Sequence, residues 1–309
     1  MNLPNFLVIG APKSGSHTLC SHLSQHPEIF VSTPKELDFF NRQYHLGIDW
    51  YRQCFRGSSH HTAIGEGSVM YSITSLWPEV PYRIAQDLPY AKLIYIVRHP
   101  LDRIESMWCQ HLSNGDHIPE FNQAVREWRP LLEGSLYWQQ LNQFRQHFPD
   151  SQILMVFLED LIADPHQTVK SCFEFLGVDS TFPIDNAYQS KHTRANLPKD
   201  TWLWSILRNT PLGRWARRIF PEDIKSVFRG FLRKKLNKVY PQWNQVTLEW
   251  AKYMVESDAK QLLQYAGKDE SFWDFSSEMI NQKLTVKPQK AKPIKFSKRP
   301  FVLTSILDY

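Results

Sequence analysis

The stretch from Phe6 to Leu19, FLVIGAPKSGSHTL, combines an apolar run, a glycine- and serine-rich turn and the start of a helix. The apolar run has no polar alternation and predicts a strand that is covered on both faces. Gly10 and Gly15 allow backbone conformations that a Cβ would block, and helical spacing begins at about Ser16. The first N–H groups of a helix have no backbone partners and carry the positive end of its dipole. We therefore expect this turn to bind an anion.

The turn differs from the phosphate loop of nucleoside triphosphatases, G-x-x-x-x-G-K-[ST], in the position of its lysine. Lys13 precedes the second glycine, Gly15, by two residues, and Ser16 and His17 follow that glycine. No later apolar strand ends in the Asp that would hold magnesium. Both departures disfavour a metal-dependent NTPase. A glycine turn that binds nothing is the remaining structural alternative, because strand–turn–helix units are common.

Two further apolar runs, residues 93–97 and 153–157, also lack polar alternation, and segments of helical period separate the three runs. Strands that alternate with helices predict an α/β fold with a central parallel sheet flanked by helices. The ligand should then lie beyond the carboxyl ends of the strands. Asp164 and Pro165 predict a helix start, with Asp as the cap and Pro in the first turn. The expected helices cover residues 16–26, 101–111, 136–148, 165–176 and 246–265.

Several segments, in the same order along the chain, resemble the sulfotransferases that use 3′-phosphoadenosine 5′-phosphosulfate (PAPS). The first motif of that family has its lysine two residues before the second glycine, followed by Ser or Thr, as in the turn above. Residues 35–41, KELDFFN, and 45–51, HLGIDWY, resemble the acceptor-side segment of the heparan-sulfate-type and bacterial branches. Residues 94–108, IYIVRHPLDRIESMW, resemble the 3′-phosphate motif, and 157–165, FLEDLIADP, the strand and turn that follow it. The resemblance extends from about residue 5 to about residue 275.

The resemblance implies a P-loop-NTPase-like sulfotransferase fold, PAPS as co-substrate, adenosine 3′,5′-bisphosphate (PAP) as product, and chemistry without a metal. PAPS needs two anion-binding elements, because its 5′-phosphosulfate and its 3′-phosphate are held apart by the ribose. The matching Arg and Ser of the family bind the 3′-phosphate, which assigns that role to Arg98 and Ser106. An ion pair of Arg98 with Asp102 or Glu105 is the alternative. The first element is the turn itself, with Lys13, Ser14, Gly15, Ser16, His17 and Thr18.

The reaction implied by the resemblance is an in-line displacement at sulfur. Negative charge grows on the oxygen that bridges sulfur and phosphorus, and Lys13 is our candidate for the cation that stabilises it. Glu36 occupies the place of the glutamate that heparan-sulfate-type members use as a base, so we assign it that role. A solvated ion pair of Glu36 with Lys35 is the alternative. His17 and His99 are rival bases, although a His beside phosphates more often donates a hydrogen bond.

The acceptor is expected to be a small molecule, either a metabolite or a sugar, that offers a hydroxyl or an amine. Asp38 and Asn41 follow the expected base and are candidate acceptor contacts. Tyr71 and Trp108 are candidate walls of an acceptor pocket, and packing in the core is an equal alternative for both.

Three departures from the family pattern bear on the site. His17 stands where the family usually has a second Thr, which shifts 5′-phosphate contacts to Thr18 or to the imidazole. Gly67 follows Glu66 where the heparan-sulfate branch has a lysine, which weakens the case for an anionic polysaccharide acceptor. Residues 189–200 replace a Pro-Arg-Ser turn close to the donor, and there Arg194 or Lys199 is expected to close over the 3′-phosphate.

Length and composition set the expected domain organisation. The 309 residues, 42% of them hydrophobic, suit one α/β domain over residues 1–278, with a Lys/Pro-rich tail over 279–309 that is expected to be extended or disordered. Residues 208–238 carry ten Lys or Arg and two acidic residues, interleaved with apolar side chains as in basic amphipathic helices. This insertion, at about residues 200–240, is a solvated face, a funnel for an anionic donor that covers the site, or a membrane or nucleic-acid surface. A nucleic-acid partner is not expected.

The four cysteines are widely separated, which predicts reduced and mostly buried thiols. The early first strand leaves no room for a signal peptide, and no apolar run approaches the roughly 20 residues that cross a bilayer, so we expect a cytoplasmic protein. The sequence does not address the oligomeric state. A nucleotide-dependent phosphoryl-transfer enzyme and a non-catalytic polyanion-binding module are the two alternative functions.

Overall fold

The computed structural model describes residues 3–114, 116, 118–185, 198–199, 234–235 and 241–285. The chain divides into two units. Unit 1 comprises Met1–Ile104, Arg129–Ser190 and Trp250–Phe275, and unit 2 comprises Glu105–Trp128, Lys191–Glu249 and Ser276–Tyr309. The lysine-bearing turn and the acceptor-side segment both belong to unit 1.

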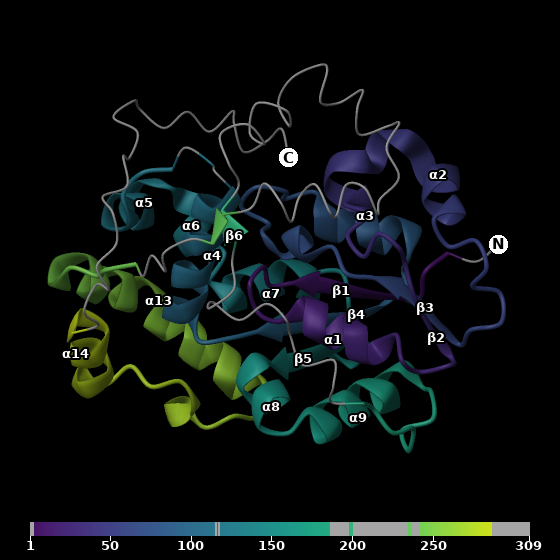
Figure 1. Cartoon of the computed structure of the whole chain (residues 1–309). Coiled ribbons are helices and arrows are strands. Elements are labelled where there is room, and N and C mark those ends of the chain that lie inside the picture. The colour runs from purple at the N-terminus through teal and green to yellow at the C-terminus, as the bar shows by residue number, and fades with distance from the viewer. Residues whose placement is uncertain are drawn as a thin grey trace. The chain divides into compact units, whose positions relative to one another are not determined.

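Unit 1 is built on a five-stranded sheet with the order β2-β3-β1-β4-β5, in which every neighbouring pair is parallel (Figure 1). All five residues of the central strand β1 are buried, as the unbroken apolar run predicts. This sheet confirms the expected α/β fold. The strands are β1 (Phe6–Gly10), β2 (Ile29–Val31), β3 (Ala63–Glu66), β4 (Lys92–Val97) and β5 (Ile153–Phe157).

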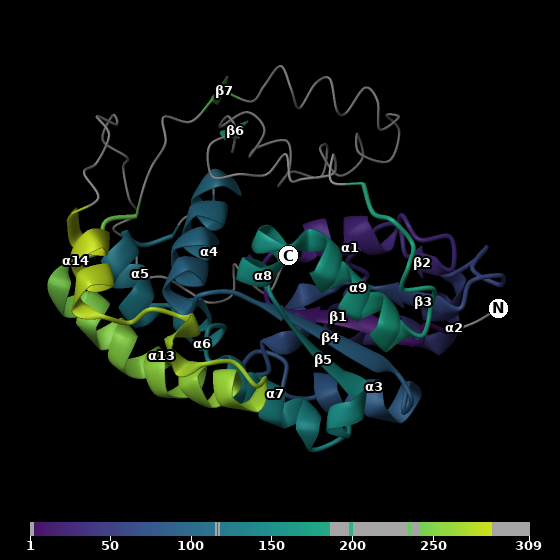
Figure 2. The same cartoon turned by 90° about the horizontal axis from the view of Figure 1, so that it is seen from below.

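Helices cover both faces of the sheet. The views in Figures 1 and 2 show α1 (Ser16–Leu23), α8 (Leu158–Ala163) and α9 (Pro165–Leu176) on one face, where they share an apolar core with all five strands. On the other face lie α3 (Val80–Asp87) and α7 (Tyr137–Arg145). The remaining unit 1 elements include α2 (Gly47–Gln53), α6 (Arg129–Glu133), most of α13 (Gln245–Tyr265) and short helical turns η1 (Phe39–Gln43), η2 (Tyr44–Leu46), η3 (Val69–Ser72), η4 (Asp150–Gln152) and η7 (Glu270–Phe272).

The expected strands and helices are present within a few residues of their predicted ends. The Asp164 carboxylate accepts the Gln167 N–H at 2.9 Å, with Pro165 in the first turn of α9, so the predicted cap is confirmed. The short strands β2 and β3 were not predicted. β3 contains Gly65, where an added Cβ would lie 2.4 Å from the Phe6 carbonyl oxygen, so only glycine permits its close pairing with β1.

Unit 2 contains the larger part of α4 (Pro100–Asn114), the start of α13, α5 (Phe121–Glu127), α14 (Ser277–Thr285) and an antiparallel pair, β6 (Pro198–Lys199) and β7 (Lys234–Lys235). Its buried Glu105 accepts from Trp243 Nε1 at 2.9 Å and from Lys283 Nζ at 2.7 Å. These bonds tie α4 to α14. Residues 279–285, which the sequence predicted to be extended or disordered, are helical, and the rest of the expected tail lies outside the described residues.

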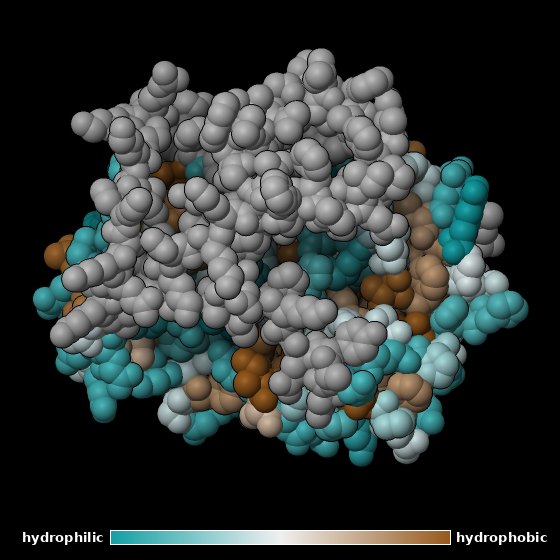
Figure 3. Space-filling view, viewed as in Figure 1, coloured by the Kyte–Doolittle hydropathy of each residue, from teal (hydrophilic) through white to brown (hydrophobic). Residues whose placement is uncertain are grey.

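Exposed large apolar side chains lie on several of the described elements. In the view of Figure 3, brown apolar groups are separated by teal hydrophilic ones. The exposed large apolar residues include Leu46 in η2, Tyr82 in α3 and Ile162 in α8, and three more lie on α13, namely Val246, Tyr253 and Met254. None of the described helices combines the length and the apolar character that crossing a bilayer requires.

Candidate active site

The turn between β1 and α1 has a left-handed backbone at Gly15, where the sequence predicted a conformation that a Cβ would block, and also at Lys13, where it predicted none. Gly15 precedes α1 with a φ of +91°, and Lys13 has a φ of +69°, so both are left-handed. Ser14 N donates to Ala11 O at 3.2 Å, and Ala11 N donates to Ile96 O of β4 at 2.5 Å. Gly15 offers no side chain to cap α1, so no capping group at that position competes for the N–H groups of the first turn. The backbone therefore has the form of an anion cradle.

The side chains of the turn lie at different depths. Lys13 and Thr18 are half-buried, and His17 is exposed. Ser16 is buried at the first position of α1, and Ser14 is fully buried. The cradle can thus offer its backbone N–H groups and the side chains of Lys13, His17 and Thr18 to a ligand. The Ser14 hydroxyl lies in the interior.

Arg98 follows β4 and reaches the cradle. Its Nη1 donates to the carbonyl oxygen of Lys13 at 3.2 Å, and its Nη2 lies 3.5 Å from Asp102 Oδ2. Its side chain is 17% exposed, and within the described part of the chain its Nε has no hydrogen-bond partner. The structure therefore brings Lys13 and Arg98 together, with one guanidinium donor unused. The ion pair with Asp102, which the sequence analysis gave as the alternative role of Arg98, is present as well, with a long distance of 3.5 Å.

Of the other residues predicted to bind the 3′-phosphate, only some belong to the described part of the chain. Ser106 lies in α4 and is half-buried. Lys199 is described only as a member of β6, which pairs with β7, and Arg194 lies outside the described residues. The basic insertion, apart from its β7 residues, also lies outside them. Their donor-side roles stay predictions.

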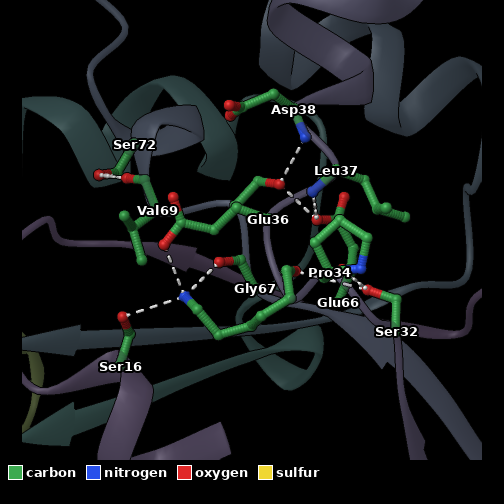
Figure 4. Close-up of polar contacts among 12 residues, drawn as sticks. Ser16, Ser32, Pro34, Glu36, Leu37, Asp38, Glu66, Gly67, Val69 and Ser72 are labelled. Carbon is green, nitrogen blue, oxygen red and sulfur yellow. Dashed lines mark hydrogen bonds and ion pairs between the residues drawn. The ribbon is translucent and has the colours of Figure 1, made fainter. Parts of the chain in front are cut away.

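The acceptor-side segment brings Lys35 and Glu36 to the carboxyl end of β3. Lys35 Nζ lies 2.9 Å from Glu36 Oε1 and donates to Gly67 O at 2.6 Å and to Ser16 Oγ at 3.4 Å (Figure 4). The Lys35 side chain is 11% exposed, whereas that of Glu36 is 37% exposed. Ser16 is the first residue of α1, so a single ammonium connects the expected base to the cradle.

Glu66, the last residue of β3, holds this segment in place. It is fully buried and accepts from Leu37 N at 3.3 Å, from the Ser68 hydroxyl, and from the hydroxyls of Tyr51 and Tyr71 at 3.0 and 2.7 Å. Burial raises its pKa, and these four donors oppose that rise. Sequence reasoning assigned Glu66 no role. The sequence feature that could have indicated its role is the position of an acidic residue directly after the apolar stretch Ala63–Gly65.

Asp38 and Asn41 lie next to each other at the start of η1. Asn41 Nδ2 donates to Asp38 Oδ1 at 3.3 Å, and Asp38 N donates to Ser68 Oγ at 2.8 Å. Burial raises the pKa of Asp38, while Arg42 and Asn41 lower it. Asn41 is buried and Asp38 is half-buried, so of the two Asp38 is the more accessible to an acceptor.

Tyr71 and Trp108 are both in the core. Tyr71 is fully buried, its hydroxyl donates to Glu66, and the same hydroxyl accepts from Phe40 N at 3.2 Å. Trp108, in unit 2, is 2% exposed and donates from Nε1 to Pro119 O at 3.1 Å. Of the two roles that the sequence left open, their placement favours packing in the core.

His99, a rival base from the sequence, is engaged by the C-terminal part of unit 1. Its Nε2 lies 3.0 Å from Asp274 O, and its ring packs on Phe275 with centroids 4.9 Å apart. Its backbone N–H donates to Glu159 Oε1 at 2.8 Å. These contacts favour a structural role for His99. His17 is exposed on α1.

The two buried thiols are unreactive, and the described residues gather no metal-binding cluster. Burial raises the pKa of Cys20 to about 11 and that of Cys172 to about 12, so both thiols are protonated near neutral pH. Within the described ranges, no three His, Cys, Asp or Glu side chains gather so that they could hold a metal ion.

The parallel sheet, the lysine-bearing turn before α1 and the arginine after β4 define a P-loop-like α/β fold with two cations at the carboxyl edge of the sheet. Residues 3–240 match the family described as the sulfotransferase domain, so the chain belongs to the sulfotransferase family. A crystal structure of a sulfotransferase from Alicyclobacillus acidocaldarius has the same fold, with a TM-score of 0.64 and 22% identity over 88% of this chain and 99% of that one.

Named relatives of the chain are heparan sulfate sulfotransferases. Mouse heparan sulfate glucosamine 3-O-sulfotransferase 3A1 is 32% identical over 186 residues, which cover 57% of this chain and 46% of the relative. Human bifunctional heparan sulfate N-deacetylase/N-sulfotransferase 2 is 33% identical over 255 residues, which cover 74% of this chain and 28% of the relative. The aligned region is therefore less than half of the length of either relative.

Proposed function

We propose that this chain is a sulfotransferase that moves the sulfuryl group of PAPS to a hydroxyl or amine of a small-molecule acceptor, a metabolite or a sugar. Family membership supports the reaction class. The observation that supports PAPS as the donor is the contact of Arg98 with the backbone of Lys13. This contact brings the two expected anion-binding elements together at one edge of the sheet. A donor with two separate anionic groups needs such a pair.

In this proposal the cradle holds the 5′-phosphosulfate through the backbone N–H groups of the first turn of α1, with Lys13 and Thr18 beside it. Arg98 binds the 3′-phosphate, since its unpartnered Nε and its planar fork suit phosphate oxygens. The role of Ser106, which belongs to unit 2, is the predicted one. The roles of Arg194 and Lys199 are the predicted ones.

The chemistry follows from these positions. The acceptor oxygen or nitrogen attacks sulfur, the bond from sulfur to the bridging phosphate oxygen breaks, and PAP leaves with the electron pair. The acceptor proton goes to the Glu36 carboxylate. Lys13 stabilises the charge that grows on the bridging oxygen, and this contact strengthens as the transition state forms.

The acceptor enters beside Glu36 and Asp38. Both relatives are named for heparan sulfate, and the mouse enzyme is also named for its glucosamine, which supports a hydroxyl or amine of an amino sugar as the first class to test. Gly67, where that branch has a lysine, argues for an acceptor with fewer anionic groups than heparan sulfate. Asp38 contacts the acceptor, and Asn41 orients Asp38.

Thermal unfolding with PAP, with ATP plus magnesium, and with heparin tests the donor. A tight ligand that binds only the folded chain raises the melting temperature by mass action. Stabilisation by PAP alone supports the proposal. Stabilisation by ATP plus magnesium alone favours a phosphoryl-transfer enzyme, and a salt-dependent effect of heparin without an effect of PAP favours a polyanion-binding module.

Mass spectrometry of acceptors incubated with PAPS tests the transfer. Wild-type protein should add one sulfuryl group to glucosamine-containing oligosaccharides or to small hydroxyl compounds. Glu36→Gln should bind PAP as wild type does and lower the transfer rate by ~100–10,000-fold. A fully active Glu36→Gln variant would move the base elsewhere.

A further inference from the structure

The ammonium group of Lys35, in the acceptor-side segment, has an oxygen partner for each of its three hydrogens. Its ammonium meets three oxygens that belong to three different parts of the site: the Glu36 carboxylate at 2.9 Å, the Gly67 carbonyl at 2.6 Å and the Ser16 hydroxyl at 3.4 Å (Figure 4). Three donors and three acceptors fill the capacity of an ammonium group. A solvated surface pair would show neither this saturation nor the 11% exposure of the Lys35 side chain.

The main chain fixes Lys35 at the end of β3. Gly67 N donates to Lys35 O at 2.9 Å, while Lys35 Nζ donates back to Gly67 O, so the two residues exchange bonds. Ser32 Oγ donates to Pro34 O at 2.9 Å, and Leu37 N is held by Glu66. The residues on both sides of Lys35 are therefore anchored, and its side chain has a defined starting point.

Gly67 makes the room that the Lys35 side chain uses. A Cβ added at Gly67 would lie 3.3 and 3.4 Å from Cγ and Cδ of Lys35 and 3.0 Å from Cys20 Sγ. A side chain at position 67 would press on the aliphatic part of Lys35. The heparan-sulfate branch has a lysine at position 67. In this chain that position is a glycine, and the side chain of Lys35 occupies the space beside it.

We propose that Lys35 is a positioning residue, whose ammonium links the base Glu36 to the first residue of the phosphate cradle and so sets the distance between base and donor. This inference rests on the proposed function, with Glu36 as the base. Ser16 belongs to α1, which carries the donor, and Glu36 belongs to the segment that carries the acceptor. Without Lys35, the Glu36 carboxylate, already 37% exposed, is free to turn toward water. A misplacement of about 1 Å can cost ~100-fold in rate.

Lys35→Met tests the inference, and Lys252→Met is its matched control. Lys252 also donates to a backbone carbonyl, that of Phe275 at 2.5 Å, and lies 3.7 Å from Glu256 Oε2. Lys35→Met should lower kcat by ~10–100-fold, with PAP affinity and the KM for PAPS within about threefold of wild type. Lys252→Met should leave kcat unchanged. Should Lys35→Met fail to fold, Lys35→Gln, which retains a donor for Gly67 O without the charge, replaces it.

A double-mutant cycle with Glu36→Gln separates positioning from direct catalysis. Since Lys35 acts through Glu36, Lys35→Met should cause no further loss of single-turnover rate in the Glu36→Gln background. An equal loss in both backgrounds would show that Lys35 acts independently of Glu36 and would overturn the inference. Gly67→Ala leaves every charge in place but presses on Lys35, and should lower kcat in the same direction.

The outcomes also separate this inference from the proposed function. Wild-type transfer with an unchanged kcat for Lys35→Met overturns the role of Lys35 alone. Absence of PAP binding and of transfer in the wild type overturns the proposed function, and the role of Lys35 with it.

Discussion

Three glycines of unit 1 provide a graded test of how the sheet and the cradle are held. Gly15 has a φ of +91°, and an added Cβ would lie 2.6 Å from Leu158 Cδ1 of α8. Gly57 has the same φ of +91° but no atom within 4 Å of the Cβ position. Gly65 has no left-handed backbone, yet its Cβ would lie 2.4 Å from the backbone oxygen of Phe6.

The free-energy cost of each Gly→Ala change follows from these surroundings. A left-handed alanine costs about 1–2 kcal/mol, and Gly15 and Gly57 share this cost. The gain from a less flexible unfolded chain, about 0.4–1 kcal/mol, also applies to both and cancels in the comparison. Gly15→Ala must in addition push the end of Leu158 out of its rotamer, for about 0.5–1.5 kcal/mol. At Gly65 the obstacle is strand backbone that cannot turn aside, so a cost above about 4 kcal/mol is expected.

Urea unfolding of the three variants measures these costs. We expect Gly65→Ala to be the most destabilised, Gly15→Ala intermediate, and Gly57→Ala the least, with about 1 kcal/mol between the last two. Added to Leu158→Ala, Gly15→Ala should cost only what Gly57→Ala costs in the wild type, because the methyl group in the way is gone. Equal unfolding free energies for Gly15→Ala and Gly57→Ala would refute the steric argument at the cradle.

Three further predictions concern pH and the donor site. Burial raises the pKa of Asp258 to about 6 from 3.8, so its contribution to stability is present below pH 3.8 and is lost as the pH rises through about 6. Compared with Asp258→Asn, wild type should lose up to ~3 kcal/mol of unfolding free energy from about pH 4 to about pH 7; a difference that does not change with pH contradicts this. Lys13→Ala should lower kcat by ~100–1,000-fold, and near-normal turnover removes Lys13 from the leaving-group role. Arg98→Ala should weaken PAP binding by ~10–100-fold in calorimetry, and an unchanged Kd rules out its assignment.

The fold was predictable because its central strands are buried on both faces. The runs at β1, β4 and β5 show no polar alternation, and the segments between them have helical period. The sequence did not predict β2 and β3, because they are only three and four residues long. In addition, β3 contains Gly65, which the pairing with β1 requires. The two-unit division of the chain depends on long-range contacts that no local pattern contains.

The candidate site was predictable where one motif provides both the backbone and the charge. The glycine spacing predicted the left-handed turn, and the position of Arg98 after a buried strand placed it at the edge that the cradle shares. The sequence did not decide burial: it left a pocket wall and the core as equal alternatives for Tyr71, whose hydroxyl donates to the buried Glu66. The role of Lys35 depends on Gly67 and Ser16, which are 32 and 19 residues away, and local spacing says nothing about such contacts.

In the proposed function, the strand order places the donor and the acceptor on different sides of the cradle. β1 lies between β3 and β4, so the cradle at its end has Glu66 and Gly67 on one side and Arg98 on the other. Neighbouring strands are about 4.8 Å apart, so the ends of β3 and β4 are separated by roughly 10 Å. A donor that extends from the cradle toward β4 leaves the β3 side open for the acceptor, where Glu36 is held through Lys35 and Glu66. Changes on the β3 side should therefore alter acceptor choice and kcat, whereas changes at the end of β4 should alter donor affinity.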